Sequence, residues 1–309
     1  MKALVIGDLI IDVYHQGKVL GASVETSHFS ASNVILDEVE RVSPGGAGFL
    51  VQNMLALGGS VIFVTCVGND KYGKEEKTLS GKRLKKIVLK DAKRITTVKE
   101  RFWVGNKKVL KWDRLDNEFI SPMLEKKILQ VVAAHIRRAD KLIVSDYRHG
   151  LITKSLARKL IGLAKAYKKP VYVDSQVAQS KSNHLWCRGA DLFCLNVKEA
   201  KSIDQKFSEK DMQKSLARLQ HMLQAKNIVL KLGEKGSASL LGENFILTPA
   251  LKIRAVDPTG AGDAFFAVLA LSKQITEKEL KIANTWAGLK TALYGTQAPT
   301  LDILKKYTI

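Results

Sequence analysis

The sequence predicts an α/β fold built on a mainly parallel sheet. Short apolar runs alternate with longer helical patterns along the chain, which is typical of a succession of βαβ units. Each short run is apolar nearly throughout, as expected for strands that helices cover on both faces. With 309 residues, 46% of them hydrophobic, the chain can bury a sizeable core, and we expect one domain over residues 1–309.

The individual elements follow from this alternation. We expect strands at 3–6, 61–67, 141–145, 171–174, 192–195 and 228–232. We expect helices at 47–57, 122–138, 154–167, 209–225, 261–273 and 277–294. Ser121 followed by Pro122 fits a helix N-cap, and Thr276 with Glu279 fits a capping box.

Two segments break the alternation, at about 13–43 and 96–113. Both are rich in Val, Thr, Ser, Phe and Trp, and residues 98–104 and 107–112 flank Gly105-Asn106, a typical hairpin turn. The two segments lie far apart in the sequence, but they could pair into a small separate sheet. We therefore expect a lid, and its exposed apolar strands favour a homodimer.

Composition limits the classes of partner. The net charge of +20 attracts anions, but the lysines are scattered, with one denser run at 81–94 and few aromatic residues between them. This pattern favours a solvated basic surface over a nucleic-acid site. No run of about 18 apolar residues could span a membrane. The three cysteines fit no zinc or disulfide pattern, and we expect a cytoplasmic protein.

The stretch from Asp257 to Asp263, DPTGAGD, points to phosphate chemistry. Gly260 and Gly262 permit close approach of a ligand to the main chain, and the helix expected from Ala261 adds its positive end. Asp263 would then lie beside a phosphate as a proton acceptor. Its alternative role is to complement the helix dipole.

Polar residues also follow several of the expected strands. They are Asp8, Asp12, Asp146, Asp174, Asn196 and Glu199. Each alone could be a turn residue or a cap, but their shared position favours a common cleft. Gly45 and Gly46 form a second glycine turn before a helix. No Walker A loop, GxGxxG or HExxH occurs, which argues against P-loop, dinucleotide-binding and zinc enzymes.

Three motifs resemble the ribokinase-like (PfkB) carbohydrate kinases. The stretch 257–263 resembles their DTxGAGD signature, 45–58 resembles their first signature, and Asn196-Val-Lys-Glu199 resembles their NxxE motif. The resemblance runs in order over essentially the whole chain. It implies a three-layer α/β/α sandwich with a β-sheet lid, and a phosphotransferase that uses ATP and Mg²⁺.

The resemblance also implies roles for particular residues. Asp263 would be the catalytic base, and the backbone at Gly260, Ala261 and Gly262 would form the anion hole. ATP would lie on Asn196, Glu199, Lys231, Gly233, Gly260, Gly262 and Asn284. Asn196 and Glu199 would hold Mg²⁺ through water, and Asp257 would lie near a potassium-type ion. Substrate would lie on Asp8, Asp12, Gly45, Gly46, Lys99, Arg101 and Asp146.

Finer features resemble the bacterial D-glycero-D-manno-heptose 7-phosphate kinases. They are the GDxxxDxY opening at 7–14, the lid motif Ser23-Val-Glu25, the stretches 39–46 and 96–101, and Ser145-Asp-Tyr147. Lys99 and Arg101 would suit a substrate that already carries a phosphate, unless they form an ordinary exposed hairpin face. The resemblance implies phosphorylation at the anomeric hydroxyl, toward ADP-heptose and lipopolysaccharide core.

The sequence departs from the family pattern at three places. Phe49 or a neighbour stands where an asparagine is usual, Arg148-His149 replaces Gly-Lys, and Asp174-Ser-Gln replaces Asp-Pro-Lys. A kinase for another sugar, sugar phosphate or nucleoside therefore stays open, as does a non-catalytic binding protein of this fold. Many of the heptose enzymes carry a second, nucleotidyltransferase domain; this chain ends at Ile309, and we expect the kinase alone.

Overall fold

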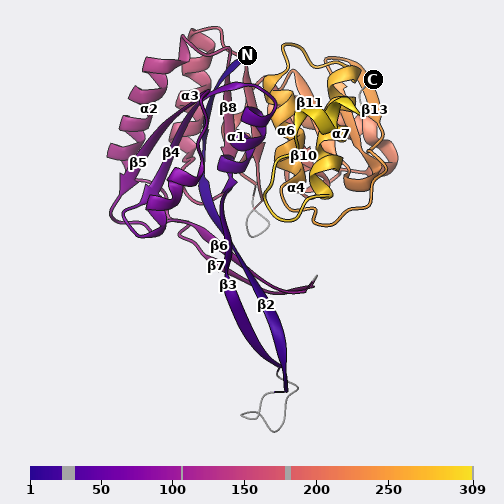
Figure 1. Ribbon diagram of the computed structural model, residues 1–309. Coiled ribbons are helices and arrows are strands. Elements are labelled where there is room, and N and C mark those ends of the chain that lie inside the picture. The colour runs from indigo at the N-terminus through magenta and orange to yellow at the C-terminus, as the bar shows by residue number, and fades with distance from the viewer. Residues whose placement is uncertain (23–31, 106, 178–181, 308–309) are drawn as a thin grey trace.

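The computed structural model describes residues 1–22, 32–105, 107–177 and 182–307. Within these residues the main sheet has nine strands in the order β13-β12-β11-β10-β9-β8-β1-β4-β5 (Figure 1). Along the chain they are β1 Lys2–Gly7, β4 Ser60–Gly68, β5 Leu84–Asp91, β8 Lys141–Asp146, β9 Val171–Ser175, β10 Leu192–Asn196, β11 Asn227–Lys231, β12 Ser237–Leu241 and β13 Asn244–Thr248.

The sheet is parallel from β11 to β5, and β12 and β13 extend it as an antiparallel hairpin. The predicted strands are confirmed, but β5, β12 and β13 were not predicted. The basic run at 81–94 contains β5, which lies at the edge of the sheet. Lysines suit such a position, because charged side chains on an edge strand discourage pairing with another sheet.

Helices cover both faces of the sheet. They are α1 Ala47–Ala56, α2 Pro122–Ile136, α3 Lys154–Ala166, α4 Val197–Ile203, α5 Met212–Leu223, α6 Ala261–Leu271, α7 Glu277–Thr291 and α8 Leu301–Lys305. Short 3₁₀ turns lie at Tyr72–Thr78, His184–Cys187, Glu209–Asp211 and Gly233–Lys235. The helix expected from residue 209 therefore begins as a 3₁₀ turn, and that expected to reach 294 ends at Thr291. Both expected N-terminal caps, at Ser121 and Thr276, are confirmed.

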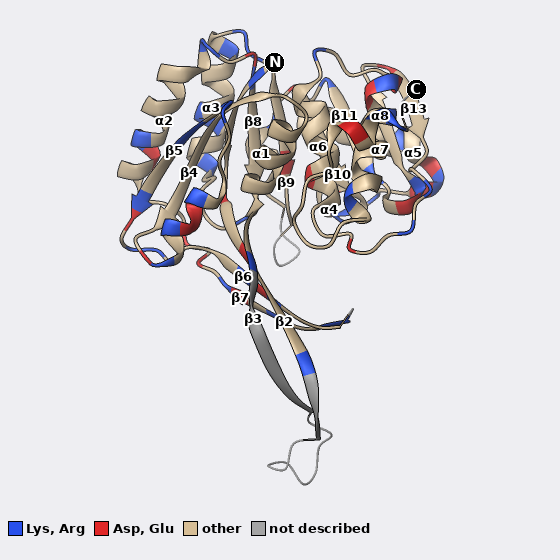
Figure 2. Cartoon of the chain, in the orientation of Figure 1, with Lys and Arg blue, Asp and Glu red and all other residues tan. Residues whose placement is uncertain are grey.

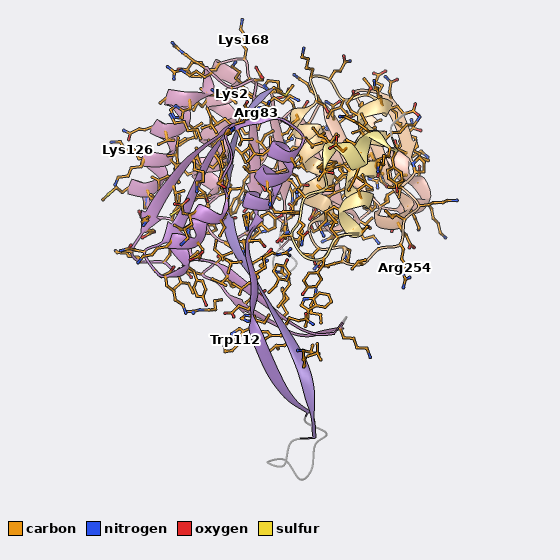
Figure 3. The ribbon with its side chains drawn as sticks, in the orientation of Figure 1. Lys2, Arg83, Trp112, Lys126, Lys168 and Arg254 are labelled. Carbon is orange, nitrogen blue, oxygen red and sulfur yellow. The ribbon has the colours of Figure 1, made fainter. Side chains whose placement is uncertain are left out.

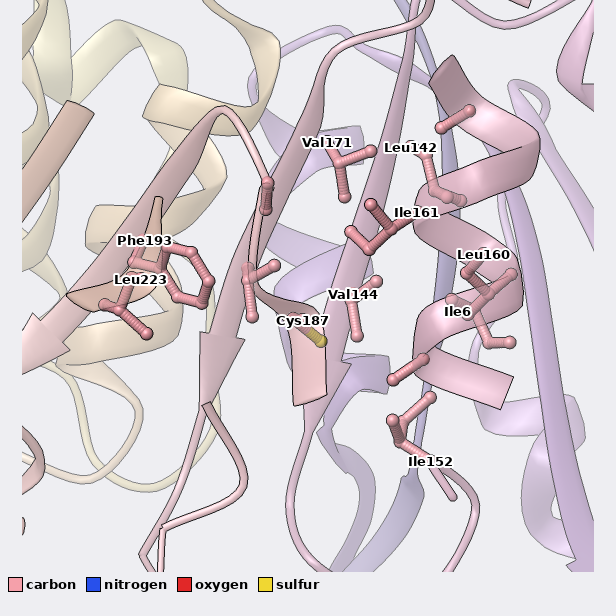
Figure 4. Close-up of a cluster of buried hydrophobic side chains, with 14 of the residues drawn as sticks. Ile6, Leu142, Val144, Ile152, Leu160, Ile161, Val171, Cys187, Phe193 and Leu223 are labelled. Atoms are coloured by element: carbon pink, nitrogen blue, oxygen red, sulfur yellow. The ribbon is translucent and has the colours of Figure 1, made fainter. Parts of the chain in front are cut away.

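Two apolar cores result, because successive strand residues point to opposite faces. Leu4 and Ile6 pack with α2, α3 and α5 in one cluster, and Figure 4 shows part of that cluster with Ile6 labelled. Ala3 and Val5 pack on the other face with α1, α6 and α7. The three-layer α/β/α arrangement expected from the sequence is confirmed.

A second sheet projects from the main one (Figure 1). Its strands are β2 Leu9–Ala22, β3 Ser32–Gly46, β6 Val98–Val104 and β7 Lys107–Arg114, in the order β3-β2-β6-β7. The predicted lid and hairpin are confirmed, but the lid begins earlier than expected, at Leu9, with only Asp8 between β1 and β2. Asp12 therefore lies within a lid strand. Ser23 to Glu25 lie outside the described residues.

Basic residues are spread over many elements in the view of Figure 2, with acidic residues between them. Among the described residues, no helix combines the length and the apolar character that crossing a membrane requires.

Candidate active site

The glycine turn before α6 has the conformation that its sequence requires. Gly260 is the residue before the helix and has φ of 80°, in the left-handed region that favours glycine. A Cβ at Gly260 would clash with the ring of Phe49, which is fully buried. Phe49, the departure from the family pattern, therefore packs against the turn and is closed to a ligand.

Asp263 lies in the first turn of α6, where the Tyr147 hydroxyl reaches it. Tyr147 O–H donates to Asp263 Oδ1. Burial raises the pKa of Asp263 to about 7, and the Tyr147 hydrogen bond opposes that rise. A carboxylate with a pKa near neutrality is suited to accept a proton and to release it again.

Asp263 faces a cavity of about 320 Å³. Seven of the predicted site residues line it: Asn196, Glu199, Lys231, Gly233, Gly260, Gly262 and Asp263. Asp174, expected in the common cleft, lines it as well, and so do Tyr147 and Gln176, for which the sequence predicted no role in the site. For Tyr147 a signal was present, because it follows the end of an expected strand.

Asn196 and Glu199 form a capping box at the start of α4. The Asn196 side chain accepts from Glu199 N at 2.9 Å, and Glu199 Oε2 accepts from Asn196 N at 2.7 Å. Burial raises the pKa of Glu199 to about 7, and the nearby Lys231 ammonium opposes that rise. The motif therefore holds the helix terminus as well as facing the cavity.

Acidic groups of the cavity suit a magnesium ion shared with ATP. Within the described chain, no three acidic, His or Cys side chains converge as a ready-made metal cage. Mg²⁺ seldom needs one, because it usually keeps several waters and binds one or two carboxylates plus substrate phosphates. Glu199 and Asp174 provide such carboxylates. Lys231 Nζ lies 3.0 Å from Asp174 Oδ1 and adds a fixed positive charge at the same wall.

A second cavity, of about 460 Å³, adjoins the first through Lys231, Gly233 and Gly262. Its walls are largely apolar and include Leu251, Ile253, Phe265 and Ala287. Asn284 also lines it, with its amide donating to Ser237 Oγ at 2.9 Å. An apolar cavity open to a polar one matches a nucleotide, whose base is flat and apolar and whose phosphates are charged.

The predicted substrate residues Asp8 and Asp146 are buried and lie outside the lining of both cavities. Asp8 Oδ2 accepts from Tyr147 N at 2.8 Å, and Asp146 accepts from Arg148 N and Ser175 Oγ, both at 2.9 Å. Burial raises the pKa of both carboxyl groups, that of Asp146 to about 7. These contacts position the segment that carries Tyr147.

Three predicted lid residues, Asp12, Lys99 and Arg101, share one face of the lid sheet, and none of them lines either cavity. Arg101 Nη1 lies 2.7 Å from Asp12 Oδ1, and both side chains are buried. Asp12 also lies so close to Gly45 that a Cβ there would clash with its carboxylate, while Gly46, with φ of 58°, precedes α1. Lys99 Nζ lies 6.0 Å from the centre of the Tyr147 ring, which brings it near Asp263. Burial lowers the pKa of Lys99, as expected for a cation held away from water.

A buried lysine occupies the position expected for a potassium-type ion. Lys290 Nζ donates to the backbone oxygens Asp257 O at 3.1 Å and Leu293 O at 3.3 Å. The carboxylate of Asp257 is also engaged, by Thr259 and by Gly295 N. Since an ammonium already holds the two backbone oxygens and the carboxylate is engaged elsewhere, the residues present do not fit a potassium ion at Asp257.

A family model described as "pfkB family carbohydrate kinase" matches residues 2–303. The chain belongs to this family. It is therefore a carbohydrate kinase, a phosphotransferase with an alcohol group as acceptor, and kinases of this family use ATP and a divalent metal ion. The resemblance found in the glycine motifs is confirmed.

The chain is also similar to curated relatives and to solved structures. The chain is 31% identical to the bifunctional protein HldE of Nitratiruptor sp. and 32% identical to that of Caulobacter sp., over 99% and 97% of its length. It spans only 64% and 61% of those proteins. Phosphofructokinase-2 from Escherichia coli, in complex with substrates and products, superposes with a TM-score of 0.79 at 18% identity, covering 99% of this chain and 98% of that one. That likeness shows the ribokinase-like fold.

Proposed function

We propose that this kinase transfers the γ-phosphoryl group of ATP to the anomeric hydroxyl of D-glycero-D-manno-heptose 7-phosphate. The product would feed ADP-heptose and lipopolysaccharide core synthesis in the cytoplasm, with residues 1–309 acting as one kinase domain. The sequence resemblance to heptose 7-phosphate kinases and the identity with the HldE proteins support this choice.

The arrangement of the two cavities supports the phosphoryl transfer. The apolar cavity takes the adenine, and the phosphates extend past Lys231 and Gly262 to the start of α6. Backbone N–H groups at Gly260, Ala261 and Gly262 stabilise the charge of the transferred group. Asp263 accepts the proton of the sugar hydroxyl. This step needs positioning and charge stabilisation more than covalent chemistry.

The position of Lys99 is the observation that carries the choice of a phosphorylated substrate. This partly buried ammonium lies on the lid above Tyr147, whose hydroxyl bonds Asp263. A sugar held between lid and base would therefore place a phosphate within reach of Lys99. The guanidinium of Arg101 is already paired with Asp12, so it contributes to substrate binding as part of that ion pair.

A panel of acceptors tests the proposal. ADP release with Mg-ATP is measured with the heptose 7-phosphate, sedoheptulose 7-phosphate, ribose, fructose 6-phosphate and adenosine. Turnover with the heptose phosphate above all others is expected. Turnover only with an unphosphorylated sugar or nucleoside would leave the kinase in place and overturn the substrate, and no turnover with any acceptor would favour a binding protein.

Lys99→Met is expected to raise KM for the phosphorylated acceptor by roughly 10- to 100-fold with little change in kcat, because a charge-assisted hydrogen bond contributes about 1.5–3 kcal/mol. Steady-state kinetics with saturating ATP measure both constants. Lys107→Met, at an exposed position of the same sheet, is the matched control. Equal effects of the two substitutions would contradict a specific role for Lys99.

Tyr147→Phe is expected to move the acidic limb of the kcat/KM profile to higher pH. Asp263 must be a carboxylate to accept a proton, so the wild-type rate falls as pH drops below about 7. Hydrogen bonding from Tyr147 stabilises the carboxylate and lowers its pKa, so removal of the hydroxyl raises it. Tyr307→Phe, at an exposed tyrosine, is the control. An unmoved limb in Tyr147→Phe would show that Asp263 does not set it.

The outer face of the lid supports a homodimer. Leu110 and Trp112 are 51% and 61% exposed, and Trp112 is labelled on the lid in Figure 3. They alternate along β7 with Lys111 and Asp113, whose face carries Lys99 and Arg101. Exposed apolar strand faces of this kind pair with a second copy in many proteins. We infer that two lids pack together through Leu110 and Trp112, and sedimentation of the purified protein tests this pairing.

A further inference from the structure

The side chain of Lys290 is fully buried in the last turn of α7. Burial of an ammonium costs several kcal/mol unless oxygen atoms and a counter-charge compensate it. A lysine near a helix C-terminus ordinarily extends into water, where it still favours the helix dipole. The burial of a lysine at this position therefore requires a specific environment that compensates its charge.

That environment is a set of oxygens from two separate segments. Lys290 Nζ donates to Asp257 O, before the glycine turn, and to Leu293 O, after α7. The next carbonyl along, Tyr294 O, accepts from Arg41 Nη2 at 3.2 Å. Side-chain cations of the chain itself thus meet the carbonyls of this segment.

The side chain of Asp257, whose backbone oxygen Lys290 contacts, is tied to the anion hole. Asp257 Oδ1 accepts from Thr259 N and Oγ1, immediately before Gly260, and Asp257 Oδ2 accepts from Gly295 N at 3.0 Å. A cation at this point therefore joins the segment after α7 to the turn whose N–H groups face the phosphate. Backbone carbonyls combined with a carboxylate are also the ligands that would replace the hydration shell of a potassium ion.

We propose that Lys290 is a tethered cation that holds the anion-hole turn in place of a bound potassium ion, so that the kinase works without added potassium. Lys290 is a positioning residue, because it touches the turn and not the reacting atoms. The proposal rests on the proposed phosphoryl transfer at this site, but not on the identity of the sugar.

Another buried lysine supplies a matched control. Lys141 is 3% exposed, donates to Ser272 O and lies 4.0 Å from the centre of the Tyr172 ring. It lines neither of the two site cavities. Loss of Lys141 and loss of Lys290 remove the same buried charge, but only Lys290 contacts the loop before the glycine turn.

The experiment compares rates of ADP formation in potassium chloride and in choline chloride, both at about 100 mM so that charge screening is equal. The wild-type rate is expected to differ less than about twofold between the two salts. The rate of Lys290→Ala is expected to fall about tenfold or more in choline chloride. Much of that rate is expected to return in potassium chloride, because the small side chain leaves the carbonyls free to bind the ion. Lys290→Met, which fills the space without charge, is expected to be slow in both salts. Lys141→Met is expected to show the wild-type ratio.

A second readout does not depend on the substrate. Potassium is expected to raise the Tm of Lys290→Ala relative to choline and to leave the wild-type Tm unchanged, because a ligand that binds only the folded state stabilises it. Wild-type enzyme that needs potassium, or a Lys290→Ala protein whose rate and Tm ignore it, would overturn the proposal. If no sugar reacts but potassium still raises the Tm of Lys290→Ala, the proposed function alone would be overturned.

Discussion

Asp263→Asn is expected to lower kcat by about 10²–10⁴-fold, the usual contribution of a positioned general base. The amide has nearly the same shape as the carboxylate, but it cannot take the proton of the sugar hydroxyl. KM for ATP is expected to change little, because the backbone of the turn and the apolar cavity are intact. Single-turnover rates at saturating ATP and acceptor measure the chemical step directly.

Asp211→Asn is the matched control for that substitution. Asp211 is an aspartate with a half-exposed side chain beside Lys214, and it lines neither cavity. Its kcat is expected to equal that of the wild type. If Asp263→Asn retained a rate within a few-fold of that control, a different group would have to be the base. Glu199 would be the next candidate, because burial also raises its pKa to about 7.

Gly260→Ala is expected to impair both folding and activity. The left-handed backbone at φ of 80° costs an alanine about 1–2 kcal/mol, and the new Cβ clashes with the buried Phe49 ring. The turn can relieve the clash only by moving its N–H groups away from the phosphate position. We expect a lower free energy of unfolding in urea, together with a kcat reduced by about 10²-fold or more, as for loss of an oxyanion donor.

Gly262→Ala separates conformational strain from the mere addition of a methyl group. The nearest atom to a Cβ at Gly262 is Lys231 Nζ at 3.5 Å, an ordinary contact, and its φ is not positive. Its free energy of unfolding is therefore expected to stay close to that of the wild type. Equal destabilisation by both substitutions would contradict the role assigned to the Phe49 contact.

Features carried by short continuous stretches could be predicted from the sequence. The buried parallel strands appear as unbroken apolar runs, and both glycine turns indicate the start of a helix. The capping residues Ser121 and Thr276 are also local signals. By contrast, β5 was missed because an edge strand mixes lysines with apolar residues, so its hydrophobic pattern resembles a solvated surface.

Contacts between distant residues could not be predicted in the same way. Lys290 meets a carbonyl 33 positions earlier in the chain, and lysine is among the residues least often buried. The bond from Tyr147 to Asp263 joins positions 116 apart. Phe49 could be recognised as unusual, but only the structure places its ring against Gly260.

The position of the lid strands in the sequence has a consequence for how substrate specificity can evolve. All four lid strands lie within residues 9–114, whereas Asn196, Lys231 and Asp263 come from the later part of the chain. In the proposed function, the segment that selects the acceptor and the segment that transfers phosphate are thus separate stretches of the gene. We therefore expect that mutations in the lid segment can change the sugar that is accepted without altering the residues proposed to perform the transfer.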